Sequence, residues 1–515
     1  MIRKIICINA VIVILLALVF CIYPAARAGL DLRDPALPQP GIPKIAWRIH
    51  RNITPRYAAW ARQRLAGGEA RKLSTDNIPG TEWTLFGSVF YLWSVENLQS
   101  AWQAGDHTAG VEPAVFSREA VVAASELVID PGQAGWVQKH WGTNYLHHEN
   151  VFYRMLIIAA LTSRENLLRD GAHTNLLRDQ VESLASELDA SKTGLLDDYP
   201  GRCFPGDVMA AIACIHRADA VLGTDHSVFV NRSLRGFIGA RATRHPLPPY
   251  QANASTGLPV SPDRGCANSY ICLTAPELWP GEARQWFQKY DEFFWQQRFG
   301  IAGYREFPKD LPGRSWMWDV DAGPVIAGYG VAANAFGVGA ARRNGRFDRA
   351  YPLAAEMLAT AWELPNGTLA VPRLLSDLSD APMLGETAIL WQLTIQPEKG
   401  FPSKTGGTVP PYVYVVLIGA LLFGAWRILE SIWTIREARR ELQPPEFRLA
   451  GPQAALWCLL MAGVLWTIWS HRWLIGFCLL LAALLLPRCK KRPVDDWDTK
   501  AVAEKQKRGA APKSE

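Results

Sequence analysis

Acidic, histidine and cysteine side chains occur in three separate loops, each of which precedes a segment rich in small apolar residues. Carboxyl and imidazole groups can donate and accept protons in catalysis, and a cysteine thiol can act as an acid or a nucleophile. These residue types therefore predict an acid–base site built from three loops. The candidate site residues are His148, Glu149, Cys203, Asp207, Glu306 and Asp321.

The same carboxylates also have structural explanations. An acid at the start of a helix caps free backbone N–H groups and meets the positive end of the helix dipole, and Asp207 and Asp321 fit that role. Glu306 directly follows Arg305, so a structural ion pair is an equal alternative to proton transfer. The Asp197-Asp198 pair is typical of a solvated turn. Capping and catalysis are compatible, and both interpretations remain open.

Four cysteines lie in the middle of the chain, and their positions predict different roles. Cys203 lies in a loop near the start of a predicted helix, whose positive end would stabilise a thiolate. Cys214 falls within an apolar helix, where a buried and inert thiol is expected. Cys266 and Cys272 are close enough in sequence to close a short disulfide loop in an oxidising compartment.

The sequence predicts no metal and no other cofactor. His147 and His148 are adjacent, so on a helix their side chains point to different faces. The chain also lacks an HExxH motif or a comparable spacing of metal ligands.

The segments that must position these loops have helical rather than alternating periodicity. The three clearest are the small-residue-rich runs 142–161, 207–222 and 323–343. More polar, amphipathic helices are expected between them, for example 176–189 and 283–297. Alternation of buried and amphipathic helices predicts an inner and an outer ring, which is an all-α (α/α) toroid with negligible sheet. The loops that enter the inner helices would then converge on one central cavity.

Four apolar runs predict membrane-spanning helices: residues 5–22, 409–426, 453–469 and 473–486. The first run ends near Ala26-Arg27-Ala28, which also fits a signal-peptidase site, so it is either an uncleaved anchor or a signal segment. The expected domains are an N-terminal anchor or signal segment at 1–28, an extracytoplasmic toroid at 29–405, three transmembrane helices at 406–487 and a basic cytoplasmic tail at 488–515.

Charge distribution predicts the orientation of these segments. The chain has 515 residues, 49% hydrophobic and 20% charged residues and a net charge of +6, but much of the positive excess lies in the tail after Pro487. We therefore expect no nucleic-acid partner. Arg3, Lys4, the arginines between 436 and 448 and the tail should face the cytoplasm, because basic loops stay inside. The expected location is a bacterial inner membrane with the main domain in the periplasm and the lipid bilayer as a partner.

Between about residues 75 and 360 the chain resembles the linalool dehydratase/isomerase family. The resemblance rests on the order of several short blocks, which are Trp141-Gly142-Thr143 with Glu149-Asn150, then Cys203-Phe204-Pro205, then Asp225 in a Gly-Thr-Asp turn, and later Arg305-Glu306 and Asp321-Ala322-Gly323. It implies an (α/α)6 barrel with a central pocket, where cysteine, acid and tyrosine side chains act on a small alcohol by proton transfer.

The resemblance is incomplete in the site itself. Cys203 matches one family cysteine, but the second aligns with Ile212, two positions before Cys214. The acid and tyrosine that the family has near its N-terminus find no match between Thr81 and Trp93. The four apolar runs also lie outside the family pattern.

Three functions follow as alternatives. The first is a membrane-anchored lyase or isomerase that acts on a small apolar alcohol. The second is a glycan-active envelope enzyme of the glycosidase or polysaccharide lyase type, by analogy with other helical toroids and in keeping with the many tryptophans. The third is a non-catalytic component of the cell envelope. A closed apolar cavity favours the first, an open groove with tryptophans and facing carboxylates the second, and a filled barrel the third. Oligomeric state cannot be read from the sequence.

Overall fold

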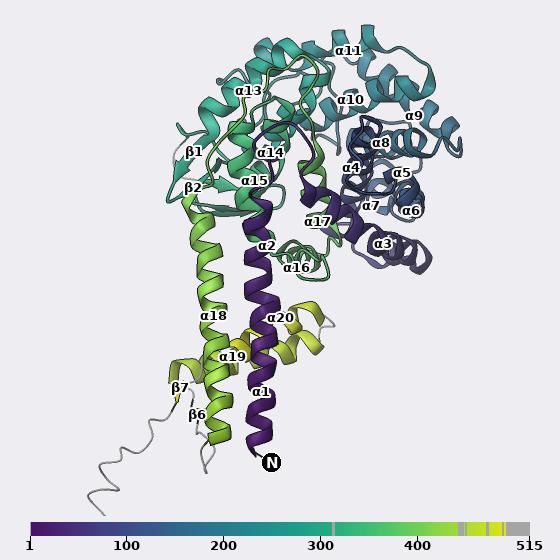
Figure 1. Cartoon of the computed structure of the whole chain (residues 1–515). Helices are drawn as coiled ribbons and strands as arrows, with labels where there is room; N and C mark the ends of the chain where they lie inside the picture. The colour runs from purple at the N-terminus through teal and green to yellow at the C-terminus, as the bar shows by residue number, and fades with distance from the viewer. Residues whose placement is uncertain are drawn as a thin grey trace, which may run out of the picture. The chain divides into compact units, whose positions relative to one another are not determined.

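The computed structural model describes residues 2–311, 315–440, 447–448, 451–469, 473–486 and 489–490. The chain is mostly helical, with a few short strands (Figure 1). It divides into two compact units, one formed by Met1–Tyr23 with Gly419–Glu515 and the other by Pro24–Ile418. We refer to them as the smaller unit and the larger unit.

The smaller unit consists mainly of apolar helices. Its elements are α1 (Ile2–Ala17), η1 (Leu18–Ile22), most of α18 (Pro411–Arg440), β6 (Phe447–Arg448), α19 (Gly451–Trp469), α20 (Trp473–Leu485) and β7 (Cys489–Lys490). Helix α19 packs against α20, and α1 also contacts α20. Gly424 permits the close approach of α18 and η1, since a Cβ atom there would meet Cys21 at 2.9 Å and Ile22 at 2.8 Å.

Two of the described helices are long and apolar enough to cross a membrane. They are Ile6–Asp31, which continues from α1 through η1 into α2 (Tyr23–Asp31), and Pro411–Arg439 in α18. Shorter apolar helices occupy Ala455–Thr467 and Ile475–Leu485. The predicted turn at 470–472, most of the basic loop after Arg440 and most of the tail from Arg488 lie outside the described residues.

The larger unit contains most of the helices and five short strands. After α2 its helices are α3 (Lys44–Gly67), η2 (Glu69–Lys72), η3 (Pro79–Trp83), α4 (Thr84–Gln103), α5 (Pro113–Phe116), α6 (Arg118–Ile129), α7 (Gly135–Trp141), α8 (Val151–Leu168), α9 (Thr174–Ala190), α10 (Pro205–Leu222), α11 (Ser227–Ser233), η4 (Leu234–Gly236), η5 (Gly239–Arg241), α12 (Gly265–Thr274), η6 (Ala275–Glu277), α13 (Pro280–Phe294), α14 (Val331–Arg343), α15 (Phe347–Ala361), α16 (Ala370–Leu378) and α17 (Leu384–Thr394). The strands are β1 (Trp295–Arg298), β2 (Ile301–Tyr304), β3 (Met317–Asp319), β4 (Gly323–Ile326) and β5 (Tyr329–Gly330).

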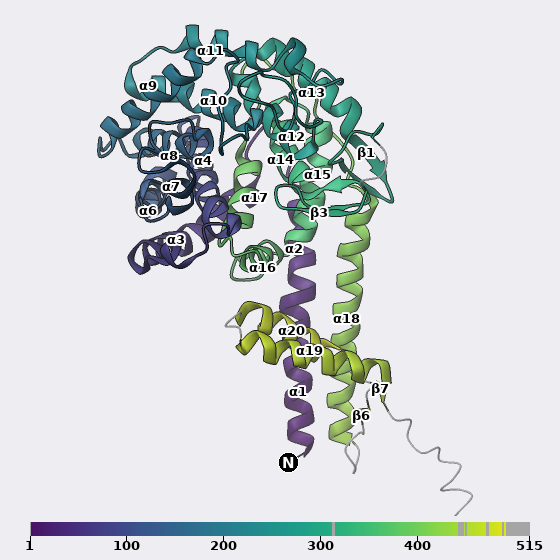
Figure 2. The ribbon, with the colours of Figure 1, turned by 180° about the vertical axis from the view of Figure 1, so that it is seen from behind.

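Six helices of this unit are largely buried and pack in neighbouring pairs. The pairs are α4 with α8, α8 with α10, α10 with α12, α12 with α14, α14 with α17, and α17 with α4 (Figure 2). More amphipathic helices cover them from outside: α6 contacts α4 and α8, α9 contacts α8 and α10, α13 contacts α12, and α15 contacts α14 (Figure 2). The buried helices are rich in Ala and Gly, so their backbones can approach closely. Gly339 on α14 is one such position, where a Cβ atom would meet Leu273 at 2.6 Å.

The strands form two small antiparallel sheets, β1-β2 and β3-β4-β5. They correct one prediction: residues 323–330, expected to begin a helix, form β4 and β5, and α14 starts only at Val331. Gly323 and Gly328 adopt positive φ angles of 68° and 88°, which turn the chain where a helix would otherwise start.

A second correction concerns the segment 142–161, in which helix α8 begins only at Val151. Glu149 and Asn150 have positive φ angles of 37° and 52°, so the residues before Val151 form an irregular loop. Helix α10 does cover the predicted run 207–222, with Pro205 at its first position. Helices α9 and α13 match the predicted amphipathic segments, except that α13 ends at Phe294 and β1 follows.

Candidate functional site

Four carboxyl groups lie near enough for each charge to influence the next. They form the carboxyl cluster, Glu82, Asp198, Asp207 and Asp321. Burial raises the pKa of Asp207 to about 8, and the charges of Asp321 and Glu82 contribute to this shift. Burial also raises the pKa of Glu82 to about 7, with a contribution from Asp321. Asp198 is 2% exposed, and burial together with Asp207 raises its pKa well above the ordinary value. Such a cluster holds protons at neutral pH.

The cluster is assembled from three segments that lead into buried helices. Glu82 lies in η3, which runs directly into α4. Asp198 lies in the loop before α10, and Asp207 is in the first turn of that helix. Asp321 lies in the turn between β3 and β4, ahead of α14. The helix dipole favours an ionised acid in a first turn, but burial dominates at Asp207, because its pKa is raised rather than lowered.

Three tyrosines border the carboxyl cluster. The Tyr250 hydroxyl donates a hydrogen bond to Oδ2 of Asp321. The Tyr199 hydroxyl lies near Glu82 and lowers its pKa, yet it makes no hydrogen bond of ordinary geometry with any described residue. The Tyr270 hydroxyl is likewise buried without a hydrogen-bond partner in the described parts of the chain, and burial and Asp207 raise its pKa. Tyr250 and Tyr199 thus face acids of the cluster, whereas the Tyr270 hydroxyl carries no hydrogen bond within the described residues.

Asp321 differs from the other acids of the cluster because it is partly exposed and lies beside a cation. Burial raises the pKa of Asp321 and the charge of Asp319 adds to the rise, while the Tyr250 hydrogen bond and the charge of Arg264 lower it. The Arg264 guanidinium stacks on the Tyr250 ring, 4.4 Å from its centroid, and its Nη2 lies 3.0 Å from Oδ1 of Asp319. Of the four acids, Asp321 is the best placed to stay ionised.

Glu306 forms an ion pair, but with Arg264 rather than with Arg305. Nε of Arg264 donates to Oε1 of Glu306 at 2.7 Å, and Sγ of Cys266 donates to the same oxygen at 3.1 Å. The backbone N–H of Cys266 donates to Oε2 at 3.2 Å. Arg305 instead donates to Oε1 of Gln296 at 2.8 Å. Glu306 is fully buried with both oxygens engaged, so it positions Arg264 rather than transferring protons.

Cys203 lies beside the carboxyl cluster, but the expected thiolate is disfavoured. The residue is fully buried, and burial raises the pKa of its thiol well above the ordinary value. The charges of Asp198, Asp197, Asp207 and Glu149 raise it further. The helix end that was expected to stabilise a thiolate is thus surrounded by acids. Cys203 is present as a neutral thiol.

Glu149 and His148 lie at the edge of this region. Oε2 of Glu149 accepts a hydrogen bond from the backbone N–H of Asp197 at 3.1 Å, which ties the loop before α8 to the loop before α10. His148 is exposed, and its ring meets the Trp141 ring edge-on with centroids 5.1 Å apart. Of the six predicted residues, Asp207, Asp321 and Cys203 lie together, and Glu306 is linked to them through Arg264 and Tyr250. Glu149 lies at the border of this group, and His148 lies at the surface.

An aromatic layer lies next to the carboxyl cluster among the buried helices. It consists of Phe86, Phe90, Phe152, Tyr270, Phe336 and Trp391. Phe86 follows Glu82 by about one helical turn and contacts the rings of Phe152 and Phe336, with centroids 5.5 and 6.4 Å apart. Phe90 stacks on Trp391 at 4.6 Å. These rings fill space between the helices and give the cluster an apolar neighbour.

Several functional candidates were missed from the sequence: Glu82, Asp198, Tyr199, Tyr250 and Arg264. The pattern that identified Asp207, a Pro-Gly pair followed closely by an acid at the start of an apolar helix, recurs at Pro79-Gly80-Thr81-Glu82 and would have found Glu82. The predicted solvated turn at Asp197-Asp198 is wrong for Asp198, whose Oδ2 accepts from the backbone N–H of Phe204 at 2.9 Å. Tyr250 and Arg264 carry no comparable signal, because they lie in an irregular loop.

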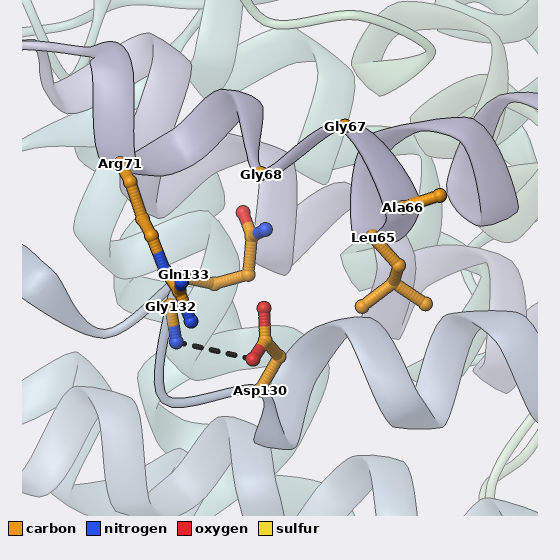
Figure 3. Close-up of a pocket in the computed structure, with 8 residues that line it drawn as sticks. All are labelled: Leu65, Ala66, Gly67, Gly68, Arg71, Asp130, Gly132 and Gln133. Carbon is orange, nitrogen blue, oxygen red and sulfur yellow. Dashed lines mark hydrogen bonds between the residues drawn. The ribbon is translucent and has the colours of Figure 1, made fainter.

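A separate pocket of about 380 Å³ lies where α3 ends, and it contains none of these residues (Figure 3). Its lining residues are Leu65, Ala66, Gly67, Gly68, Arg71, Asp130, Gly132 and Gln133. The backbone N–H of Gly132 donates to Oδ1 of Asp130 at 3.1 Å, which shapes the loop. The pocket offers one arginine and one acid, without the perturbed groups found in the carboxyl cluster.

Neither a metal-ligand cluster nor a disulfide is found in the described parts of the chain. No group of three or more His, Cys, Asp or Glu side chains there is arranged to hold a metal ion. Cys203, Cys214, Cys266 and Cys272 are free, buried thiols, and Cys266 and Cys272 both lie in α12 rather than closing a loop. Burial raises the pKa of Cys214 to about 12, in agreement with the predicted inert thiol.

No protein-family model matches this chain, and a search of curated proteins finds no similar sequence.

Proposed function

We propose that the larger unit is an acid–base enzyme, a lyase or isomerase that acts on a small, largely apolar alcohol. The observation that carries the proposal is the carboxyl cluster, in which burial and neighbouring acids raise the pKa values of four carboxyl groups from three helix entrances. Perturbed acids gathered from distant parts of a sequence are typical of catalytic sites. The resemblance to the linalool dehydratase/isomerase family points to the same reaction class.

The architecture proposed for this unit is an (α/α)6 toroid. Its support is the order in which the buried helices pack, α4, α8, α10, α12, α14, α17 and again α4, with the more amphipathic helices outside. In such a ring, helices of the same direction begin at one end. The acids that precede α4, α10 and α14 would then share that end, which agrees with their electrostatic coupling.

The proposed reaction is elimination of water. Asp207 or Glu82, protonated near neutral pH, donates its proton to the substrate hydroxyl, so that the C–O bond breaks and water leaves. Asp321, ionised beside Tyr250 and Arg264, removes a proton from the neighbouring carbon, and the C–H electrons form the new C=C bond. Tyr199 and Tyr270 can donate hydrogen bonds to the hydroxyl. Readdition of water at another carbon would give the isomerase reaction.

A glycan-active enzyme is the second candidate, and one observation favours it. Trp316 and Trp318 are exposed at β3, directly before Asp319 and Asp321. Exposed tryptophans beside carboxylates are suited to sugar rings.

The aromatic layer favours the third alternative, a non-catalytic envelope component, because it fills space between the buried helices.

The test compares wild-type protein with Asp207→Asn and a matched control, Asp106→Asn, in which the acid lies in an exposed loop. Purified protein is incubated with small tertiary and allylic alcohols and, separately, with envelope oligosaccharides, and the products are identified by mass spectrometry. We expect dehydration of an alcohol, a loss of at least about 100-fold in Asp207→Asn, as is usual for a general acid, and no change in Asp106→Asn. Cleavage of oligosaccharide alone would support the second candidate, and no turnover of either class the third.

We further propose that the chain is anchored in a bacterial inner membrane with the larger unit in the periplasm. The two apolar helices Ile6–Asp31 and Pro411–Arg439 support attachment to a bilayer. The positions of Arg and Lys beside the apolar runs support an orientation with both termini in the cytoplasm.

A further inference from the structure

Two groups of exposed apolar side chains interrupt the polar surface of the larger unit. The strand patch consists of Phe299, Trp316, Trp318 and Ile326, of which Phe299 and Trp318 are each 75% exposed. The helix patch consists of Val371, Leu375 and Leu378 on α16, with Leu375 56% exposed. Single exposed apolar residues are ordinary, but groups of large ones indicate a partner.

The strand patch has one outward face that the sheet register defines. Met317 pairs with Val325 and Trp318 with Pro324. Met317 and Val325 pack inward on Cys266 and Ala322. Because side chains alternate along a strand, Trp316, Trp318 and Ile326 lie on the opposite, outer face.

Phe299 completes the strand patch at the tip of the β1-β2 hairpin. It has a positive φ of 57° in a two-residue turn where Asn or Gly is usual. The hairpin is tied to the second sheet by the Tyr329 hydroxyl, which donates to the Ile301 carbonyl at 2.9 Å. The Arg298 guanidinium lies 5.2 Å from the Phe299 ring centroid, so a cation accompanies the aromatic tip. An exposed aromatic in a strained turn indicates a contact outside the chain.

The strand patch adjoins the start of a candidate membrane span. The backbone N–H of Tyr412, in the first turn of α18, donates to the Gly300 carbonyl at 3.1 Å. A Cβ atom at Gly300 would lie 3.4 Å from Pro411. The hairpin tip therefore packs on the point at which the chain enters the apolar helix.

The helix patch adjoins the end of the other candidate span. Val371, Leu375 and Leu378 follow helical spacing on one face of α16, while Pro372 and Ser376 are buried on the other. Arg48 ties this region to α2, since its Nη2 donates to Asp31 at 2.5 Å and to Glu363 at 2.7 Å. Glu363 pairs with Leu369, the residue before α16. Asp31 is the last residue of the first span.

We propose that the strand patch and the helix patch rest in the headgroup region of the bilayer that the two spans enter. Each patch is joined by hydrogen bonds to the end of one span, and both belong to the larger unit. Trp and Phe prefer the membrane interface, and an amphipathic helix lies in its plane. Arg298 suits an anionic lipid surface. This inference rests on the proposed membrane attachment and is independent of the proposed reaction.

The experiment uses the full chain in nanodiscs of phosphatidylcholine and phosphatidylglycerol, with Cys7, Cys458, Cys478 and Cys489 replaced by serine. An environment-sensitive fluorophore is attached at Trp318→Cys, Leu375→Cys or the control Val228→Cys, whose valine is 65% exposed on α11. Doxyl-labelled lipids should quench positions 318 and 375 by about twofold or more and leave position 228 unchanged, because quenching needs contact with the lipid interface.

The outcomes distinguish attachment of the chain to a membrane from contact of the two patches with the headgroup region. Failure of the chain to enter nanodiscs overturns both proposals. If the chain enters nanodiscs but positions 318 and 375 are quenched no more than position 228, the patches do not contact the headgroup region, and the proposed membrane attachment still stands. A blue shift at 318 or 375 that depends on protein concentration and not on lipid composition assigns the patches to a second copy of the chain, which also overturns the inference.

Discussion

Glu82 and Asp207 lie in surroundings that favour the protonated acid. Their pKa values are about 7 and about 8 in the folded chain, against about 4 in an unfolded one. Between these values the folded state retains protons that the unfolded state has lost. Stability contributed by these groups therefore falls as the pH rises from about 4 to about 8. At high pH these two acids therefore lower the stability of the folded chain, which an exposed carboxylate that only caps a helix would not do.

The first prediction concerns that cost. At pH 9, Glu82→Gln should be more stable than the wild type, on the order of 4 kcal/mol, because the amide remains neutral where the buried carboxylate must ionise. At pH 4.5 the two proteins should unfold alike. Asp207→Asn should behave in the same direction. Thermal unfolding in detergent at several pH values measures the effect, and a stability gain that is the same at every pH would contradict it.

The second prediction concerns the thiol of Cys203. Because it is fully buried among acids that raise its pKa, iodoacetamide should modify it only after the chain unfolds. A cysteine placed at the exposed position 228 provides the control and should react within minutes in the folded protein. Peptide mass spectrometry reports both sites. Rapid modification of Cys203 in the folded state would restore the thiolate predicted from the sequence.

The individual site residues were predictable to different degrees. Asp207 and Asp321 could be identified because an acid before a small-residue-rich helix is a local pattern. For Glu306 the alternative of a structural ion pair was foreseen but its partner was not, since Arg264 reaches it from 42 residues away and the adjacent Arg305 turns elsewhere. Cys203 was misjudged for a similar reason. The helix dipole is a local effect, whereas the opposing carboxylates come partly from the loop before another helix.

Among the elements, the entrance to α12 is fixed by contact between two backbones. A Cβ atom at Gly265 would lie 2.0 Å from the carbonyl oxygen of Arg305, and the Gly265 N–H donates to the Glu306 carbonyl at 2.8 Å. This contact holds Cys266 and Arg264 against Glu306. The site therefore depends on a glycine that carries no chemistry.

The third prediction follows from that contact. Gly265→Ala should destabilise the protein by about 2 kcal/mol or more, because a backbone atom cannot move aside as a flexible side chain can. Gly281→Ala is the matched control, since Gly281 lies in α13 with nothing within 4 Å of its Cβ position. Alanine there should be neutral or stabilise by up to about 1 kcal/mol. Denaturant unfolding compares them, and equal stability of both variants would show that the α12 entrance tolerates movement.

Helical periodicity predicted α9, α10 and α13 well, because each pattern extends over most of the helix. It failed at 323–330, where small apolar residues are compatible with both helix and strand. There the positive φ angles at Gly323 and Gly328 decide for a hairpin. It failed again at 142–150, since the left-handed conformation at Glu149 and Asn150 depends on tertiary hydrogen bonds. One of these runs from the Glu149 N–H to Glu187 at 3.0 Å.

At the scale of the whole molecule, the unequal lengths of the apolar helices bear on the topology. Ile6–Asp31 and Pro411–Arg439 have 26 and 29 residues, enough for a bilayer core of about 30 Å. Helix α19 has 19 residues, but α20 has 13 and rises only about 20 Å. In the proposed attachment, the chain between these two spans lies on one side of the membrane. Two arrangements of α19 and α20 are therefore compatible with the proposed attachment. Either both helices cross the bilayer, which must be locally thinner at the short α20, or neither crosses.

The last prediction is that both termini and the segment after α18 are cytoplasmic, and that residues 30–405 are periplasmic. Arginines at 436, 439 and 440 at the end of α18, together with the basic tail, favour the inside. Reporter fusions after Glu441 and at the C-terminus should both report cytoplasm, because α19 and α20 form a pair whether or not they cross. A fusion at His471 separates the two cases: a periplasmic signal indicates four crossings, and a cytoplasmic one indicates two. A periplasmic signal at Glu441 or at the C-terminus would reverse the orientation, and with it the compartment in which the carboxyl cluster works.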